Sequence, residues 1–176
     1  MTRRFPAALA AWCLLALVGV LRIPTALAMT SSTQFFTSGP QAALERAIRA
    51  DDASAIAAAL AHGASANATG KFDITPLMIA VDAQNPRAVQ ALLLAGARPN
   101  AIARDGNGPV SLAVKSYLAK PFGRQIMMAI FNGGGDPNAR QPDGDPVLMR
   151  FIYDRDAADL KLMKQLGANL DILDRT

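Results

Sequence analysis

Two neighbouring stretches decide the fold of this chain: ITPLMIAV at residues 74–81 and VQALLLAGA at residues 89–97. In the first stretch, Thr75 is suited to cap the free N–H groups of a helix start, and Pro76 suits the first helical position, where no N–H is needed. The second stretch ends at Gly96, a residue type that adopts the left-handed conformation of a helix end at little cost. The sequence therefore predicts two short antiparallel helices, a unit too small to bury its own apolar face.

The same unit recurs at a spacing of 33 residues. Six identities relate the two segments, and they include leucines, alanines, a glycine and an asparagine. The pairs are Leu44 and Leu77, Ala47 and Ala80, Leu60 and Leu93, Gly63 and Gly96, Ala64 and Ala97, and Asn67 and Asn100. A fixed period of this length is typical of a solenoid, in which stacked repeats bury a continuous core.

Residues 75–80, TPLMIA, resemble the T-P-L-H-x-A signature of the ankyrin-repeat family, with Met78 in place of the usual histidine. Residues 92–100 resemble the end of the family's second helix and the turn after it. The resemblance covers residues 41–176 and implies an all-α ankyrin-repeat solenoid of about four helix-turn-helix repeats with short hairpin fingers. We expect the repeats at residues 41–70, 71–103, 104–140 and 141–171.

Residues 1–28 have the features of a secretory signal peptide. Arg3 and Arg4 form its charged start, residues 7–21 an apolar run of 15 residues, and residues 26–28 an A-x-A cleavage site. The apolar run is shorter than the ~20 residues that a spanning helix needs, which favours cleavage over an uncleaved membrane anchor. We therefore expect an exported protein, with residues 29–40 as the leader of its mature form.

Cleavage changes the charge and the chemistry of the chain. The chain has 18 Lys+Arg and 14 Asp+Glu, and the signal removes three arginines and no acid, so the formal net charge falls from +4 to +1. The pI near 9.6 is therefore no indication of nucleic-acid binding. Cys13 and Trp12 leave with the signal, which excludes a disulfide in the mature monomer. An Ala- and Arg-rich composition with far more Asp than Glu suggests a high-GC bacterium, so the expected location is the periplasm.

The first repeat is expected to act as a cap. Its first helix alternates apolar residues with Glu45, Arg46 and Arg49, which predicts a polar face toward solvent. In the leader before it, Phe35 and Phe36 either belong to a flexible segment or cover the open end of the helix stack, and we favour the cover.

The third repeat is five residues longer than the second, and the extra residues lie between Val114 and Ile126. We expect a lengthened first helix that ends at residues 120–121, followed by a longer turn. Insertions in repeat arrays often lie in loops of the binding face. In the fourth repeat, residues 146–148 are expected to open the first helix.

The sequence contains no evident catalytic set. His62 is the sole histidine and occupies the last turn of a predicted helix, where it suits the helix dipole. Residues 133–135, GGG, lack the Lys-Ser/Thr of a phosphate-binding loop, and residues 143–145, DGD, lack the spacing of a calcium-binding loop. We therefore predict no enzyme, no cofactor and no metal site.

Partners of ankyrin repeats usually contact the finger tips and the exposed concave side of the first helices, and the resemblance carries these positions onto this chain. The expected anchors are the aromatic residues Tyr117, Phe122 and Tyr153, since Tyr is enriched at the hot spots of interfaces. Alternatively, Tyr117 and Phe122 only fold the longer loop onto the stack. The predicted partner-binding residues are Lys71, Phe72, Asp73, Asp82, Arg104, Asp105, Asn107, Lys115, Ser116, Tyr117, Phe122, Gln141, Asp143 and Tyr153.

The resemblance and the signal peptide together imply a non-enzymatic, monomeric module that binds one protein in the bacterial periplasm, without nucleic acid and without a membrane span after cleavage. One version is an immunity-type antagonist of a toxic envelope enzyme, and another is an accessory to an exported oxidative-stress enzyme. The rival classes are a hydrolase or metal protein on this scaffold and an effector released beyond the envelope. Only analogy at the level of the fold separates the antagonist from the accessory version.

Overall fold

The computed structural model describes residues 34–147, 149 and 157–171. The predicted signal peptide, the start of the leader, Tyr153 and part of the expected helix opening at residues 146–148 lie outside this part of the chain. The helices are α1 (Gly39–Arg49), α2 (Ala53–Ala61), the 3-10 helix η1 (Lys71–Asp73), α3 (Pro76–Asp82), α4 (Pro86–Leu94), α5 (Pro109–Ala119), α6 (Gly123–Asn132) and α8 (Ala157–Gln165). The all-α class is confirmed for the described residues, among which no helix has both the length and the apolarity to cross a membrane.

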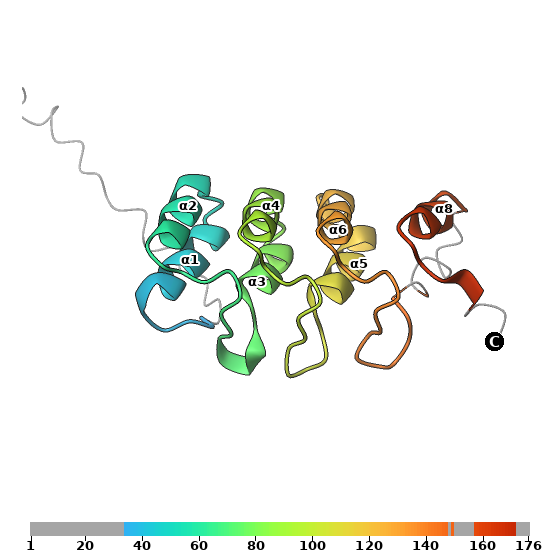
Figure 1. Ribbon diagram of the computed structural model, residues 1–176, viewed down its shortest axis with the longest axis horizontal. Coiled ribbons are helices and arrows are strands. Elements are labelled where there is room, and N and C mark those ends of the chain that lie inside the picture. The colour runs from blue at the N-terminus through green and yellow to red at the C-terminus, as the bar shows by residue number, and fades with distance from the viewer. Residues whose placement is uncertain (1–33, 148, 150–156, 172–176) are drawn as a thin grey trace, which may run out of the picture. The chain divides into compact units, whose positions relative to one another are not determined.

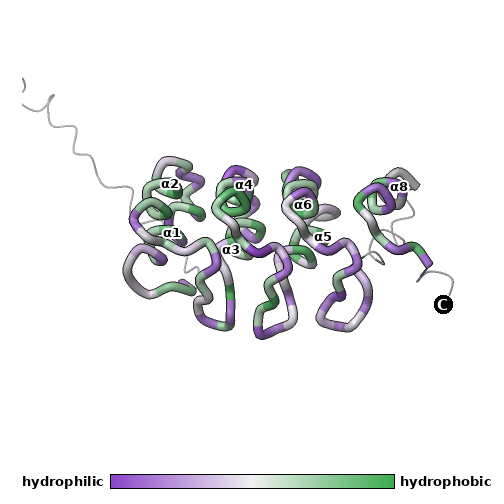
Figure 2. Tube along the Cα trace, viewed as in Figure 1, coloured by the Kyte–Doolittle hydropathy of each residue, from purple (hydrophilic) through white to green (hydrophobic). Residues whose placement is uncertain are grey.

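The helices pack in pairs, and the pairs stack side by side (Figure 1). Helix α1 packs on α2, α3 on α4, and α5 on α6. Between repeats, α3 contacts α1 and α5, and α4 contacts α2 and α6, so the helices form two rows. Figure 2 shows that hydrophobic residues concentrate in the helices, whereas the loops that project beyond the row of α1, α3 and α5 carry hydrophilic stretches.

Side-chain caps start α3 and α4, and the cap of α3 is the one that the sequence predicts. The Thr75 hydroxyl accepts a hydrogen bond from the N–H of Met78 at 3.4 Å, and Pro76 is the first residue of α3. Asn85 caps α4 by accepting from the N–H of Ala88 at 2.9 Å. The same buried amide donates to the carbonyl of Ile48 at 3.0 Å, so one side chain both starts a helix and fastens it to the preceding repeat.

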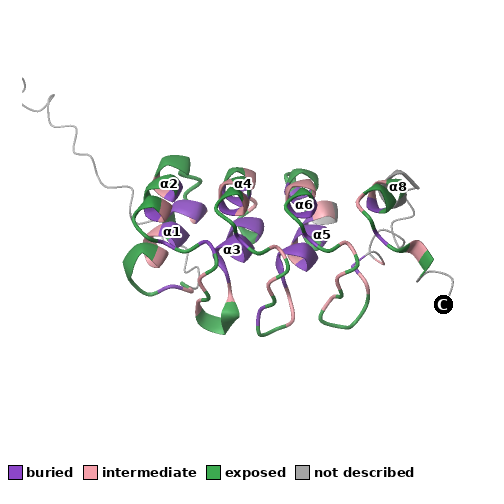
Figure 3. Ribbon diagram, viewed as in Figure 1, coloured by how far each residue is buried: buried purple, intermediate pink, exposed green. Residues whose placement is uncertain are grey.

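The core runs through the described repeats as one cluster between the two rows (Figure 3). Leu77 and Leu92 are 1% and 0% exposed, and each such side chain contributes about 1.5–3 kcal/mol when fully buried. Leu93, the repeat partner of Leu60, is half-buried and packs against the core, while the neighbouring Leu92 is fully buried within it. Leu94 is 90% exposed, so the three consecutive leucines of α4 have three different environments.

The extra residues of the third repeat lie in its helices. Helix α5 has 11 residues against 7 in α3, and α6 has 10 against 9 in α4. The lengthened helix is thus confirmed, whereas the longer turn is wrong, because residues 120–122 and 83–85 are both three-residue turns. Four added residues make about one helical turn, which keeps the apolar side of α5 facing the stack.

The turn at residues 120–122 nevertheless has its own geometry. In the first two repeats, Asp51 and Gln84 occupy equivalent turn positions with φ of 52° and 55°. Pro121 has its φ fixed near −65° by its ring and is excluded from that left-handed conformation.

Three asparagines tie the repeats together along the loops. Each donates to the carbonyl of the glycine that ends the next helix pair, and each accepts from the N–H two residues beyond that glycine, at 2.7–3.3 Å. The asparagines are Asn67, Asn100 and Asn138, and the glycines are Gly96, Gly134 and Gly167. The sequence identity of Asn67 and Asn100 therefore has a physical reason in this ladder.

Candidate functional site

Three hairpin fingers project from the stack below the helices (Figure 1). The ends of each finger are joined by a backbone hydrogen bond of 2.7–2.8 Å, across residues 70–74, 103–107 and 141–145. The first two fingers are also linked, because the N–H of Arg104 donates to the carbonyl of Phe72 at 3.0 Å. These two fingers therefore present equivalent residues side by side.

Residues 34–38, which we call the strap, replace the missing finger of the first repeat. The N–H of Lys71 donates to the carbonyl of Phe35 at 3.1 Å, the same link that joins Arg104 to Phe72 one repeat later. Gly70 permits this approach, since a Cβ atom there would lie 2.7 Å from the carbonyl oxygen of Phe35. Phe36 is buried in the core and Phe35 packs against it, so the expected covering role of these residues is confirmed.

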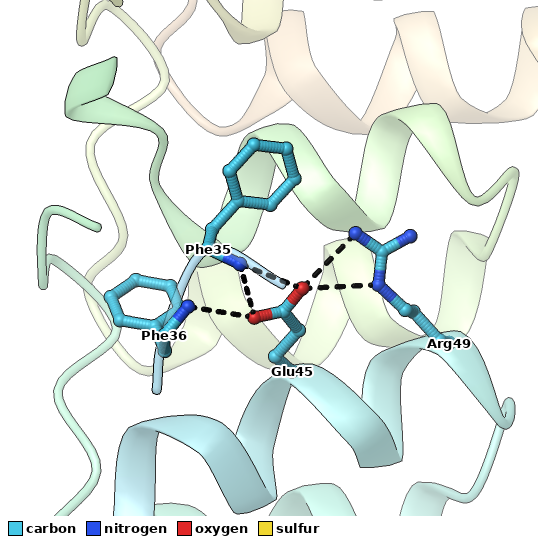
Figure 4. A network of polar contacts seen from close by, with 4 residues as sticks. All are labelled: Phe35, Phe36, Glu45 and Arg49. Atoms are coloured by element: carbon cyan, nitrogen blue, oxygen red, sulfur yellow. Dashed lines mark hydrogen bonds and ion pairs between the residues drawn. The ribbon is translucent and has the colours of Figure 1, made fainter. Parts of the chain in front are cut away.

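Glu45 holds the strap in place (Figure 4). Its carboxylate accepts from the N–H of Phe35 at 3.0 Å and from that of Phe36 at 2.9 Å. On its other side it accepts from the guanidinium of Arg49 at 3.1 and 3.2 Å. The polar solvent face predicted for Glu45 is therefore wrong: its side chain is 2% exposed, because the strap covers it and supplies the donors that a buried charge requires.

Phe72 is the most unusual residue of the fingers. It has φ of 60°, a conformation in which a bulky side chain is strained, and 55% of it is exposed. The Arg104 guanidinium lies 6.0 Å from the centre of its ring, and the Nε atom of Arg104 lies 3.6 Å from Asp73. An exposed aromatic ring beside a cation is thereby held at a finger tip at some cost to the fold.

Two hollows adjoin the strap and the fingers. One, of about 520 Å³, is lined by Phe35, Phe72, Ile74, Arg104 and Asp105. The other, of about 140 Å³, has an apolar lining from Phe35, Ile74, Met78 and Leu112, and a charged lining from Arg49, Asp82 and Asp105. Both hollows share Phe35, Ile74 and Asp105, so the strap contributes to both.

Asp105 is held in its charged form. Its carboxylate accepts from the Asn107 side chain at 2.8 Å and from the Asn107 N–H at 3.0 Å. These hydrogen bonds, the side-chain bond first, hold the pKa of Asp105 below its ordinary value of 3.8, although partial burial acts in the opposite direction. The hollows therefore contain a fixed negative charge at neutral pH.

The predicted partner-binding residues fall into several groups. Most are exposed, two are half-buried in the fingers, and Tyr153 lies outside the described part of the chain. The exposed residues are Lys71, Phe72, Asp73, Asp82, Arg104, Asp105, Lys115, Asp143 and the 49%-exposed Phe122, and the half-buried finger residues are Asn107 and Gln141.

The inserted region between Val114 and Ile126 exposes less surface to a partner than its sequence indicates. Ser116 is 8% exposed and so offers a partner almost nothing to contact. Tyr117 packs against the core, and its hydroxyl accepts from Arg124 at 3.0 Å. The prediction omitted Phe35, which lines both hollows, although two adjacent phenylalanines in a polar leader were the available signal.

The described residues present no metal centre. No group of three or more His, Cys, Asp or Glu residues that could hold an ion occurs among residues 34–147, 149 and 157–171. His62 follows α2 as its C-cap residue and is exposed, as expected for a residue at a helix end.

Helix pairs joined by three-residue turns, stacked in two rows and carrying fingers along one edge, define a tandem-repeat binding scaffold. Residues 72–104 match the ankyrin repeat family, so this segment of the scaffold is similar to an ankyrin repeat. Ankyrin repeats are typically protein-binding modules without catalytic activity. No curated protein matches the chain.

Proposed function

We propose that this protein is an exported binding module that captures a protein partner in the bacterial periplasm with its fingers and the adjoining hollows. The observation that carries the proposal is the pair Phe72 and Arg104. Phe72 exposes 55% of its area from a left-handed conformation, and Arg104 lies over its ring.

Folding alone does not account for that pair. A left-handed conformation at a bulky residue costs of order 1–3 kcal/mol, and an exposed ring gains little from burial in return. Aromatic and arginine side chains are the residues that carry most binding energy at protein interfaces, where a partner desolvates them. A partner that covers Phe72 and Arg104 would recover the energy that the isolated fold loses.

Export rests on residues 1–28, whose charged start, apolar run and A-x-A site are those of a cleaved signal. In cell fractionation, the protein is expected in the periplasm, with the mass of a chain that starts at Met29. Retention of the full-length chain in the cytoplasm or the inner membrane would exclude this location.

Within that location, we propose the role of an immunity-type antagonist that covers the active site of a toxic envelope enzyme. The support is the combination of an export signal, a binding scaffold and the lack of an evident catalytic set in the sequence. Such an antagonist should inhibit its captured partner at a stoichiometry of one to one. A captured partner whose activity rises would instead indicate an accessory role.

The binding proposal is tested with tagged mature protein incubated with periplasmic extract of the source organism. A stoichiometric partner should bind the unaltered protein and be lost from the variant Phe72→Ala/Arg104→Ala. Leu94→Ala is the matched control, because Leu94 is 90% exposed on α4, in the row of helices away from the fingers. Equal capture by all three proteins would show that the fingers are not the binding surface.

A further inference from the structure

We propose that the 140 Å³ hollow beside the strap is a pocket for one basic side chain, lysine or arginine, of a protein partner. The inference rests on the proposed function in so far as the side chain belongs to a bound protein. The size of the hollow comes first: small-molecule sites occupy about 300–1,000 Å³, so this hollow accommodates a single side chain rather than a whole ligand.

The charges that line the hollow do not balance. Arg49 is neutralised by Glu45, whose carboxylate accepts two hydrogen bonds from it at 3.1 and 3.2 Å. Asp82 and Asp105 also line the hollow, and neither forms an ion pair within the described part of the chain. Arg104 is adjacent, but it lines the neighbouring hollow and lies 3.6 Å from Asp73. The remaining charge of the hollow is therefore negative.

The position of Asp82 strengthens this inference. It is the last residue of α3, and a carboxylate at a helix C-terminus is repelled by the negative end of the helix dipole. Asp82 is exposed and forms no ion pair within the described residues, so no direct partner offsets this repulsion. A cation supplied by a bound partner would offset the repulsion between Asp82 and the helix dipole.

The apolar part of the hollow matches the rest of a basic side chain. Ile74, Met78 and Leu112 supply surface for a methylene stem, while Asp82 and Asp105 are available to the charged head. Lysine and arginine bury their stems in this way while the cation stays at a polar rim. Phe35, held by Glu45, forms a further wall, so the pocket is complete only when the strap is docked.

The test uses the mature chain and n-butylammonium chloride, which reproduces the stem and head of lysine. Amide signals of residues around Met78 and Asp105 should shift saturably in ¹⁵N-¹H spectra, with half-saturation on the order of 10 mM for so small a probe. Sodium butyrate, of equal length and opposite charge, should cause no saturable shift. The shifts should weaken as ionic strength rises, since salt screens exposed charges.

The variant Asp82→Asn/Asp105→Asn should raise the half-saturation concentration at least about fivefold. It should remain folded with a slightly lower melting temperature, because the amide introduced at position 105 still accepts from the Asn107 N–H but loses the bond from the Asn107 side chain. The neutral amide at position 82 no longer opposes the helix dipole. Asp143→Asn is the matched control, since Asp143 is the carboxylate at the equivalent position of the 141–145 finger, outside the lining of the hollow.

Saturable shifts with butyrate, equal shifts in all variants, or no saturable shift with butylammonium up to roughly 100 mM would each overturn the proposal. Saturable shifts with calcium ions but none with n-butylammonium would also overturn it. Because the probe replaces the partner, these outcomes are independent of whether extract yields a captured protein. The experiment therefore distinguishes failure of the pocket proposal from failure of the proposed binding function.

Discussion

Glu45→Ala is the most informative single substitution in this protein. It removes the acceptor of the Phe35 and Phe36 N–H groups, which bond to the carboxylate at 3.0 and 2.9 Å. A buried donor left without a partner costs about 1–3 kcal/mol, which sets the loss at about 2–6 kcal/mol if the strap stays in place. Arg49 is 27% exposed and can turn to solvent, so its lost ion pair adds little.

Release of the strap limits that loss. A released strap satisfies its N–H groups with water but gives up the burial of Phe36, which is worth about 1.5–3 kcal/mol. We therefore expect Glu45→Ala to lower the free energy of unfolding by about 1.5–3 kcal/mol, through release rather than strain. Glu45→Gln keeps one acceptor oxygen and should lose about half as much.

Urea unfolding measures the stability, and native-state hydrogen exchange locates the change. The amides of Phe35, Phe36 and Lys71 should lose protection in Glu45→Ala, because all three form strap hydrogen bonds. Gly70→Ala should expose the same amides without altering Glu45, since its Cβ would lie 2.7 Å from the Phe35 carbonyl oxygen. Arg46→Ala, at an exposed site of the same helix, is the control. Wild-type urea midpoints and intact protection in Glu45→Ala would refute the reasoning.

Three further substitutions test other parts of the fold. Leu92→Ala removes a fully buried side chain and should cost about 2–5 kcal/mol in urea unfolding, whereas Leu94→Ala, at a 90% exposed site, should stay within about 0.5 kcal/mol. Asn100→Ala breaks both bonds to the next repeat and should cost about 1–2 kcal/mol, against no change for the exposed Asn132→Ala. A backbone hydrogen bond at the start of α2 holds the pKa of Asp52 below 3.8, so its carboxylate stabilises the fold above that pH and the contribution is lost as pH falls through the lowered pKa. Thermal melts of Asp52→Asn should therefore show a weaker loss of stability on acidification than those of the wild type.

The architecture was predictable because local signals and the repeat period agree. Thr75 and Pro76 fix the start of α3 through cap geometry, and Gly96 takes φ of 81° after α4, as its place in the pattern requires. The identity of Asn67 and Asn100 reports a hydrogen bond that each repeat must form with the next. Such features depend on nearby residues or on a constant offset, and both are visible in a sequence.

The errors concern contacts that no period specifies. Glu45 is buried because Phe35 and Phe36, ten and nine residues earlier, lie over it. The pattern of the helix itself does not indicate that contact. The insertion was divided between a lengthened helix and a longer turn, whereas it lies in α5 and α6, and about one turn added to α5 preserves the facing of its apolar residues. Ser116 consequently lies on the buried side of a longer helix, where the prediction expected a surface. The separation of Leu92 from Leu93 likewise depends on helix rotation, which a run of three leucines does not reveal.

The asparagine ladder makes residues 67–99 an interchangeable cassette. The segment begins with the asparagine that reaches forward and ends just before its successor, so a duplicate inserted after Pro99 keeps a donor and an acceptor for each junction. The array is thus extendable by whole steps of 33 residues, each adding one more finger to the row. Residues 67–99 therefore form a module for protein engineering whose hydrogen bonds to both neighbouring repeats are already defined.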